Sequence, residues 1–327
     1  MKISSFCALI ASFIAGARAQ ESGHALTLLK SIPLPGVEGR IDHMDADVAG
    51  KRVFIAALGN NSVEVVDLTS GARTQSLSGF QEPQGVAYVP EYDRLFVANG
   101  GDGTCRILDG HSLKTIASVA VGDDADNVRY DPKSRKVYVG YGTGGLAVLD
   151  AKSGKRLEDI HLPGHPEAFQ MEKGGSRLFV NIPTSFKVTV VDREKKEVIQ
   201  SWIPKGSMNF PMTLDEKNHR LFVGCRLPAK VLVFDSNTGR QIASVPIGAD
   251  TDDLYYDPSA KLLYASCGGG TVDVIEQTAP DTYQKIDSRQ SAPGARTSLF
   301  IPELKSLCVA VPHRVSQTSA LRVFKTP

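Results

Sequence analysis

Residues 37 to 45, VEGRIDHMD, place several ionisable side chains close together just ahead of an apolar strand. Arg40, Asp42, His43 and Asp45 lie within six positions. A histidine beside carboxylates can act as a general acid or base, and an arginine can bind an anion or stabilise a developing oxyanion. These residue types suit a binding or catalytic site, so the next question is which elements position them.

The elements around this segment belong to an internal repeat. A short strand of mostly aliphatic and aromatic residues, which begins with a basic or polar residue in six of its copies, occurs seven times at steps of 41 to 44 residues. A repeat of this length is typical of propeller blades. The seven copies of this marker strand are RVFIAA from Arg52, RLFVAN from Arg94, KVYVGY from Lys136, RLFVNI from Arg177, RLFVGC from Arg220, LLYASC from Leu262 and SLCVAV from Ser306.

Each copy contains four short alternating segments separated by turns. An apolar segment such as GVAYVP precedes the marker strand, a third strand such as SVEVVD ends in aspartate, and a fourth strand follows a turn such as TSG. Four short strands per repeat, without helical periodicity beyond the N-terminal segment, indicate an all-β fold. We predict a seven-bladed β-propeller with four-stranded antiparallel blades, formed by residues 20–327 as a single domain.

The seventh copy is incomplete at its C-terminal end. It ends at Phe324, about where its third strand should end. We predict that ALTLLKSIPL, residues 25–34, supplies the missing fourth strand of this last blade. Such a strand would join the two ends of the chain and protect sheet edges that are otherwise open to pairing.

The repeated strands also resemble those of a known family. KVYVGY, RLFVAN and RLFVNI, with VVD third strands and YDP turns, are similar to the repeats of the YncE-like, YVTN-repeat seven-bladed β-propellers, which are secreted or periplasmic. The resemblance covers essentially the whole chain after the N-terminal segment. It implies the fold, but it brings no established catalytic set to these positions, because propellers host many unrelated functions.

The N-terminus has the pattern of a secretory signal. Residues 1–19 contain Lys2, an apolar stretch, and Ala-Arg-Ala directly before Gln20. We predict a signal peptide over 1–19 and a secreted or periplasmic mature protein. No segment has the roughly 20 apolar residues of a membrane span. Removing Lys2 and Arg18 leaves 35 basic residues against 36 acidic ones, a balance that argues against nucleic-acid binding.

The cysteines carry no recognisable metal or redox motif. No two of them are close in sequence, so there is no C-x-x-C pattern. An oxidising compartment permits disulfides without defining their pairing, and the alternative is that these side chains are small buried hydrophobes. We expect a monomer. The four cysteines that follow the predicted signal peptide are Cys105, Cys225, Cys267 and Cys308.

Polar residues recur at one place in the repeat. The position ten residues before each marker strand lies near the start of the innermost strand, beside the central channel. Most of its occupants, and several neighbours on the same face, are polar or charged, which predicts a polar ring at one channel mouth. The candidate ligand-binding residues are Arg40, Asp42, His43, Gln84, Asp126, Asn127, His165, Glu167, Asp252, Asp253, Arg296 and His313.

The carboxylates of this ring would repel one another unless solvent, raised pKa values, arginines or a cation offset the repulsion. Near Arg296, ion pairs lining a watery channel are the plain structural interpretation. Another sector has no ring arginine and could hold a divalent cation, with its oxygen-rich ligands favouring Ca²⁺, Mg²⁺ or Mn²⁺ over Zn²⁺. The candidate metal ligands are Asp126, Asn127, His165 and Glu167.

Three functions are compatible with these features. The first is a module that binds a small polar ligand or a partner at the channel mouth, and the polar ring favours it. The second is a metal-assisted hydrolase or lyase at the same mouth, with His43 and His165 as candidate catalytic residues. The third is a protein-interaction scaffold that uses its rim or its opposite face. The residues leave open whether the protein is an enzyme.

Overall fold

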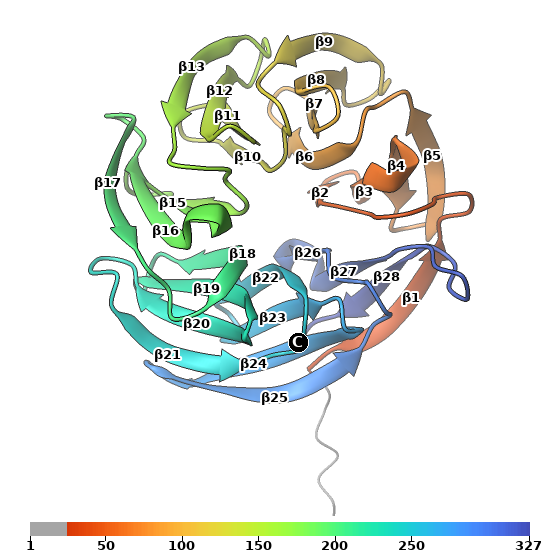
Figure 1. The fold of residues 1–327 in the computed structure, drawn as a ribbon. Helices are drawn as coiled ribbons and strands as arrows, with labels where there is room; N and C mark the ends of the chain where they lie inside the picture. Colours follow the sequence, from red (N-terminus) through yellow and green to blue (C-terminus); the bar gives the residue numbers. More distant parts are fainter. Residues whose placement is uncertain (1–24) are drawn as a thin grey trace, which may run out of the picture.

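The computed structural model describes residues 25–327. The predicted signal peptide, residues 1–19, and the predicted mature N-terminus at Gln20 lie outside this range. Seven four-stranded antiparallel sheets surround a central axis (Figure 1). The prediction of an all-β, seven-bladed propeller is therefore confirmed.

The innermost strand of each blade comes first and the outermost comes last, except in the seventh blade. Blades one and two are β2 (Met44–Asp47), β3 (Arg52–Ala57), β4 (Ser62–Asp67), β5 (Ala72–Ser78), and β6 (Pro83–Val89), β7 (Arg94–Asn99), β8 (Thr104–Asp109), β9 (Thr115–Ala120). Blades three and four are β10 (Val128–Asp131), β11 (Lys136–Tyr141), β12 (Gly145–Asp150), β13 (Arg156–His161), and β14 (Phe169–Met171), β15 (Arg177–Ile182), β16 (Lys187–Asp192), β17 (Glu197–Trp202). Blades five and six are β18 (Ser207–Asp215), β19 (Arg220–Leu227), β20 (Ala229–Asp235), β21 (Gln241–Pro246), and β22 (Thr251–Asp257), β23 (Leu262–Cys267), β24 (Thr271–Ala279), β25 (Thr282–Gln290).

The seventh blade combines both ends of the described chain. Its strands, from the axis outward, are β26 (Ser298–Ile301), β27 (Ser306–Val311), β28 (Ala320–Lys325) and β1 (Thr27–Pro33). β1 pairs antiparallel with β28, which confirms the predicted N-terminal strand. Beyond the strand end, the Leu34 backbone N–H donates to the Ser319 carbonyl at 3.0 Å.

Burial falls from the inner strands to the outer ones. All residues of β7 except the first are buried, whereas β5 exposes most of its residues. The apolar core consists of seven clusters, each of which combines residues of two adjacent blades. For example, Phe54 of blade one packs with Val86 and Leu95 of blade two. Because each sheet buries both faces against neighbours, the ring must close before every blade is covered.

The aspartates that end the third strands build the turns that follow them. In five blades this carboxylate accepts hydrogen bonds from backbone N–H groups two or three residues ahead. This local bonding is the ordinary reason that aspartate begins a turn. The five residues are Asp67, Asp109, Asp150, Asp192 and Asp235.

All four cysteines of the described chain are free and buried. Burial raises the pKa of Cys105 and of Cys308 to about 12. They are therefore small apolar core side chains, one of the two alternatives that the sequence left open. Within residues 25–327, no helix is long and apolar enough to cross a membrane.

Candidate functional site

The ring of polar residues lies on the connections that lead from one blade into the next. In three blades the backbone N–H of the ring residue donates to a carbonyl at the end of the neighbouring marker strand. Asp42 donates to Ala56 at 2.7 Å, and Glu167 donates to Asn181 at 3.0 Å. Asp126 makes the equivalent bond. The backbone therefore holds the ring residue beside the channel whatever its side chain. We call this end of the channel the channel mouth.

A second tier of side chains lies two residues before each ring position. Arg40 and His165 belong to it, and so do Asp124 and Asp250, which sequence reasoning missed. In five blades this residue adopts a left-handed backbone conformation, including Asp124 (φ 48°) and Asp250 (φ 60°). The repeat itself contains the signal for Asp124 and Asp250, because Arg40 and His165 occupy the equivalent position in their own blades.

Arginines neutralise the carboxylates of blades six and one. Arg296 Nε lies 2.9 Å from Asp252 Oδ2, and Arg296 Nη1 lies 2.9 Å from Asp250 Oδ1. Arg226 pairs with the same two aspartates, and its guanidinium carbon lies 3.7 Å from the centre of the Phe210 ring. These side chains form a closed network of ion pairs, as the structural interpretation of this sector expected.

Asp42 has a separate partner. Arg40 Nη2 lies 2.8 Å from Asp42 Oδ2. Burial raises the pKa of Asp42 to about 6, and the charges of His43 and Arg40 oppose that rise. Asp42 is buried, whereas the Arg40 side chain is 45% exposed. The Arg40 guanidinium therefore pairs with Asp42 on one side and stays open to solvent on the other.

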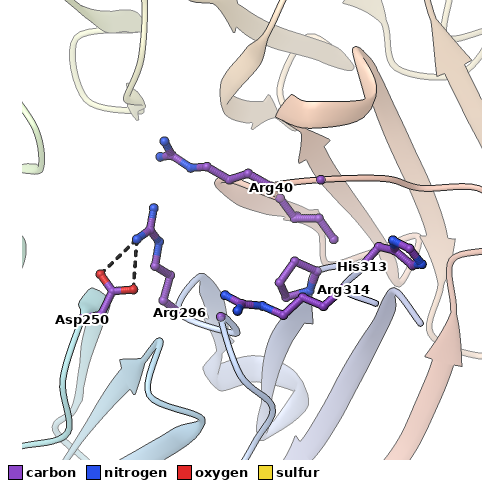
Figure 2. Close-up of a pocket in the computed structure, with 9 residues that line it drawn as sticks. Arg40, Asp250, Arg296, His313 and Arg314 are labelled. Atoms are coloured by element: carbon purple, nitrogen blue, oxygen red, sulfur yellow. Dashed lines mark hydrogen bonds and ion pairs between the residues drawn. The ribbon is translucent and has the colours of Figure 1, made fainter. Parts of the chain in front are cut away.

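A pocket of about 310 Å³ opens beside this network, between blades six, seven and one (Figure 2). Arg40, Arg296 and Arg314 all line it, together with Asp250. No ion pair joins Arg314 to any residue of 25–327. A Cβ on Gly294 would lie 2.4 Å from Arg314 Nη2, so the glycine makes room for this guanidinium. The pocket therefore has an excess of positive charge.

The sequence-predicted His313 lies at the edge of this pocket. Its Nδ1 is 2.6 Å from Glu38 Oε2, and in Figure 2 its ring points away from the arginines. Gln84 is also engaged, because its Nε2 donates to Asp124 Oδ1 at 2.8 Å. Both residues lie on the mouth side of the protein, but their polar groups already have protein partners.

Histidine and carboxylate side chains gather in blades three and four. Asp126, His165 and Glu167 each offer one ligand atom, and these atoms lie within 4.8 Å of one another. His165 Nε2 is 3.8 Å from Asp126 Oδ2 and 4.0 Å from Glu167 Oε1. His165 Nδ1 faces Asp124 Oδ2 at 3.7 Å. We call these four residues the carboxylate-histidine cluster.

Burial and like charge act together in this cluster. Burial, reinforced by the charge of Asp126, raises the pKa of Glu167 to about 7, whereas His165 opposes the rise. Burial lowers the pKa of His165, but the neighbouring carboxylates of Asp126, Glu167 and Asp124 outweigh burial, so the net shift is upward. The cluster holds more negative charge than its own histidine balances.

His43 lies between the cluster and a buried aspartate. Its Nε2 is 2.9 Å from Asn127 Nδ2 and 3.7 Å from Asp126 Oδ1, and its Nδ1 is 4.0 Å from Asp253 Oδ1. When the Asn127 amide donates to Nε2, the imidazole carries its proton on Nδ1, toward Asp253. Asn127 is thus turned toward His43 through its amide nitrogen, while its buried Oδ1 has no hydrogen-bond partner among the described residues. Asp253, 6% exposed, accepts a hydrogen bond from Ser298 N beneath the mouth.

The fold and this mouth define a seven-bladed β-propeller with a charged channel opening. No family model matches the chain. The chain is similar to the antigen Lp49 of Leptospira interrogans serogroup Icterohaemorrhagiae serovar copenhageni, at 23% identity over 239 residues. That match spans 67% of this chain but only about half, 51%, of the antigen.

Among solved structures, the chain is similar to one described as Kuenenia stuttgartiensis hydrazine synthase. The two share 17% sequence identity with a TM-score of 0.77, over 90% of this chain and 99% of the other. Identity at this level shows the common fold alone. The resemblance to the YVTN-repeat propellers remains a prediction.

Proposed function

We propose that this propeller binds a small anionic ligand at the channel mouth, in the pocket between Arg40, Arg296 and Arg314. The observation that carries the proposal is Arg314, a guanidinium directed at the pocket without an ion-pair partner among residues 25–327. Guanidinium groups bind carboxylates and phosphates through paired hydrogen bonds. The pocket volume of about 310 Å³ suits a small organic acid or a small phosphate ester.

The neighbouring charges support this ligand class. Asp250 is the carboxylate among the lining residues, and it already pairs with Arg226 and Arg296. A cationic ligand would meet the positive charge of Arg40 and Arg314, whereas an anion would neutralise it. The predicted secreted or periplasmic location would expose this pocket to ligands from outside the cytoplasm.

The proposal is tested by thermal unfolding and calorimetry with phosphate, succinate, citrate, a hexose phosphate and the uncharged hexose. We expect at least one anion, and not the uncharged sugar, to raise the melting temperature. Arg314→Ala should weaken binding of that anion at least tenfold, because a charge-assisted hydrogen bond is worth about 1.5–3 kcal/mol. Arg240→Ala removes an exposed arginine from a turn on the opposite face and should bind like the unmodified protein.

Equal affinity of the Arg314→Ala variant and the unmodified protein would contradict the proposal. A protein that binds none of these anions would contradict it too, and would leave a protein-interaction scaffold as the better interpretation.

A further inference from the structure

We propose that Asp126, His165 and Glu167 bind one divalent first-row transition-metal ion, of the Zn²⁺ or Mn²⁺ type. The site is separate from the anion pocket and does not depend on it. Its residues lie at the start of blades three and four, across the seven-membered ring from blade seven, which contributes Arg296 and Arg314 (Figure 1).

The spacing of the polar atoms is the first observation. His165 Nε2 is 3.8 Å from Asp126 Oδ2 and 4.0 Å from Glu167 Oε1. These separations are too long for hydrogen bonds. Two ligand atoms that each lie about 2.1 Å from one metal ion are at most about 4.2 Å apart. One ion between the three side chains would therefore contact all of them after only small adjustments.

An unsatisfied buried carboxylate is the second observation. Asp126 is only 5% exposed, and its Oδ1 has no hydrogen-bond partner among the described residues. A buried carboxylate normally requires hydrogen bonds, a counter-charge or a metal. The nearest cationic group to Oδ1 is His43 Nε2 at 3.7 Å, which is already 2.9 Å from the Asn127 amide. A metal ion in the cluster would supply the missing counter-charge.

The surroundings of His165 are the third observation. With Nε2 directed at the proposed ion, Nδ1 faces Asp124 Oδ2 at 3.7 Å. Asp124 is held in turn by Gln84 Nε2 at 2.8 Å. A carboxylate on the far nitrogen of a metal-binding histidine orients the ring and strengthens the ligand. Nδ1 has no hydrogen-bond partner among the described residues, so Asp124 is assigned as a positioning residue that would act through His165 once this 3.7 Å gap closes to a hydrogen bond.

The ligand set also indicates the metal. Ca²⁺ takes six to eight oxygen ligands and Mg²⁺ prefers oxygen and water, whereas imidazole with carboxylates suits Zn²⁺, Mn²⁺ and their neighbours. The amide nitrogen of Asn127 faces His43, and its buried Oδ1 has no hydrogen-bond partner among the described residues, so Asn127 stays a candidate oxygen ligand beside the three. The histidine ligand therefore shifts the preference away from Ca²⁺ and Mg²⁺, while Mn²⁺, the third ion that the sequence favoured, is retained and Zn²⁺ joins it.

The test uses the full-length protein without a histidine tag. After chelation and dialysis, calorimetry should show one tight site for Zn²⁺ or Mn²⁺ and weaker binding of Ca²⁺ and Mg²⁺. Glu167→Gln should weaken metal binding at least tenfold. Asp124→Asn should weaken it by about tenfold to a hundredfold, as outer partners of metal ligands commonly do.

His313→Ala is the matched control, because it removes another histidine that pairs with a carboxylate on the same face. This variant should bind metal normally. Thermal unfolding of each metal-free variant checks that it is folded, and Asp126→Asn provides a second variant if Glu167→Gln is not. The proposal is overturned if the folded, metal-free protein binds none of these ions, if Ca²⁺ binds more tightly than Zn²⁺ and Mn²⁺, or if only His313→Ala abolishes binding.

Discussion

Asp253 shows how burial sets the charge of one side chain beneath the channel mouth. Burial raises its pKa to about 7, while His43, the Ser298 backbone N–H and Arg129 act in the opposite direction and Asp252 adds to the rise. In an unfolded chain, aspartate titrates near 3.8. The folded protein therefore keeps a proton on this carboxyl over a range in which the unfolded chain has lost it.

This difference predicts a pH dependence of stability. The contribution of Asp253 is fully present below about pH 4 and is lost as the pH rises through 7. Between pH 5 and pH 8 the unmodified protein should lose about 2–3 kcal/mol more unfolding free energy than Asp253→Asn. The amide keeps an oxygen for Ser298 N but does not titrate. Urea unfolding at the two pH values measures this, and parallel pH profiles would refute it.

The position of the mouth could be predicted from the sequence, but most of its pairings could not. Counting back from the marker strands located Asp126, Glu167 and Asp252 because strand spacing is regular. The pairing of Arg226 with Asp250 and Asp252 depends on the side-chain directions of residues about 25 positions apart. Spacing along the chain does not encode those directions.

At the scale of single elements, β1 decides whether the ring is closed. Its inward residue Ile32 is 1% exposed and packs in the cluster between blades seven and one. Leu29, on the same strand, is 54% exposed. Substituting each of the two residues in turn therefore distinguishes the packing of the buried face of β1 from its backbone pairing with β28.

Ile32→Ala should lower the unfolding free energy by about 2–4 kcal/mol, because it leaves a cavity in a packed cluster. Leu29→Ala should change it by less than about 0.5 kcal/mol. Denaturant unfolding of both variants measures the difference. Similar values for the two would mean that β1 does not contribute to closure through its buried face.

The strands themselves were predictable because each blade repeats the same alternation and the same turn chemistry. The aspartates that end the third strands act locally, so they give the same signal in every copy. The fourth strand of blade seven could be predicted because the seventh repeat has only three strands of its own, and residues 25–34 are the remaining strand-like segment. The strand alternation, the turn residues and the requirement of four strands per blade were therefore sufficient to predict the fold.

At the scale of the whole molecule, seven clusters between blades connect the ring into one cooperative unit. The buried cysteines report on this property, since Cys105, Cys225, Cys267 and Cys308 lie in blades two, five, six and seven. Each thiol should react only when its blade opens.

We predict that a thiol reagent, followed by peptide mapping, modifies all four cysteines at one common rate, equal to the rate of global unfolding. Closure through β1 is the physical reason, because no blade loses its neighbours unless the ring opens. Faster modification of one cysteine in native buffer would show that its blade opens separately.

The backbone bond that holds Asp42, Asp126 and Glu167 at the mouth does not involve their side chains. The chemistry of the opening is therefore separable from the stability of the scaffold. The three positions that this bond supports can be exchanged one at a time. The same architecture could thus acquire a different specificity by a few replacements at the mouth while its folding stays unchanged.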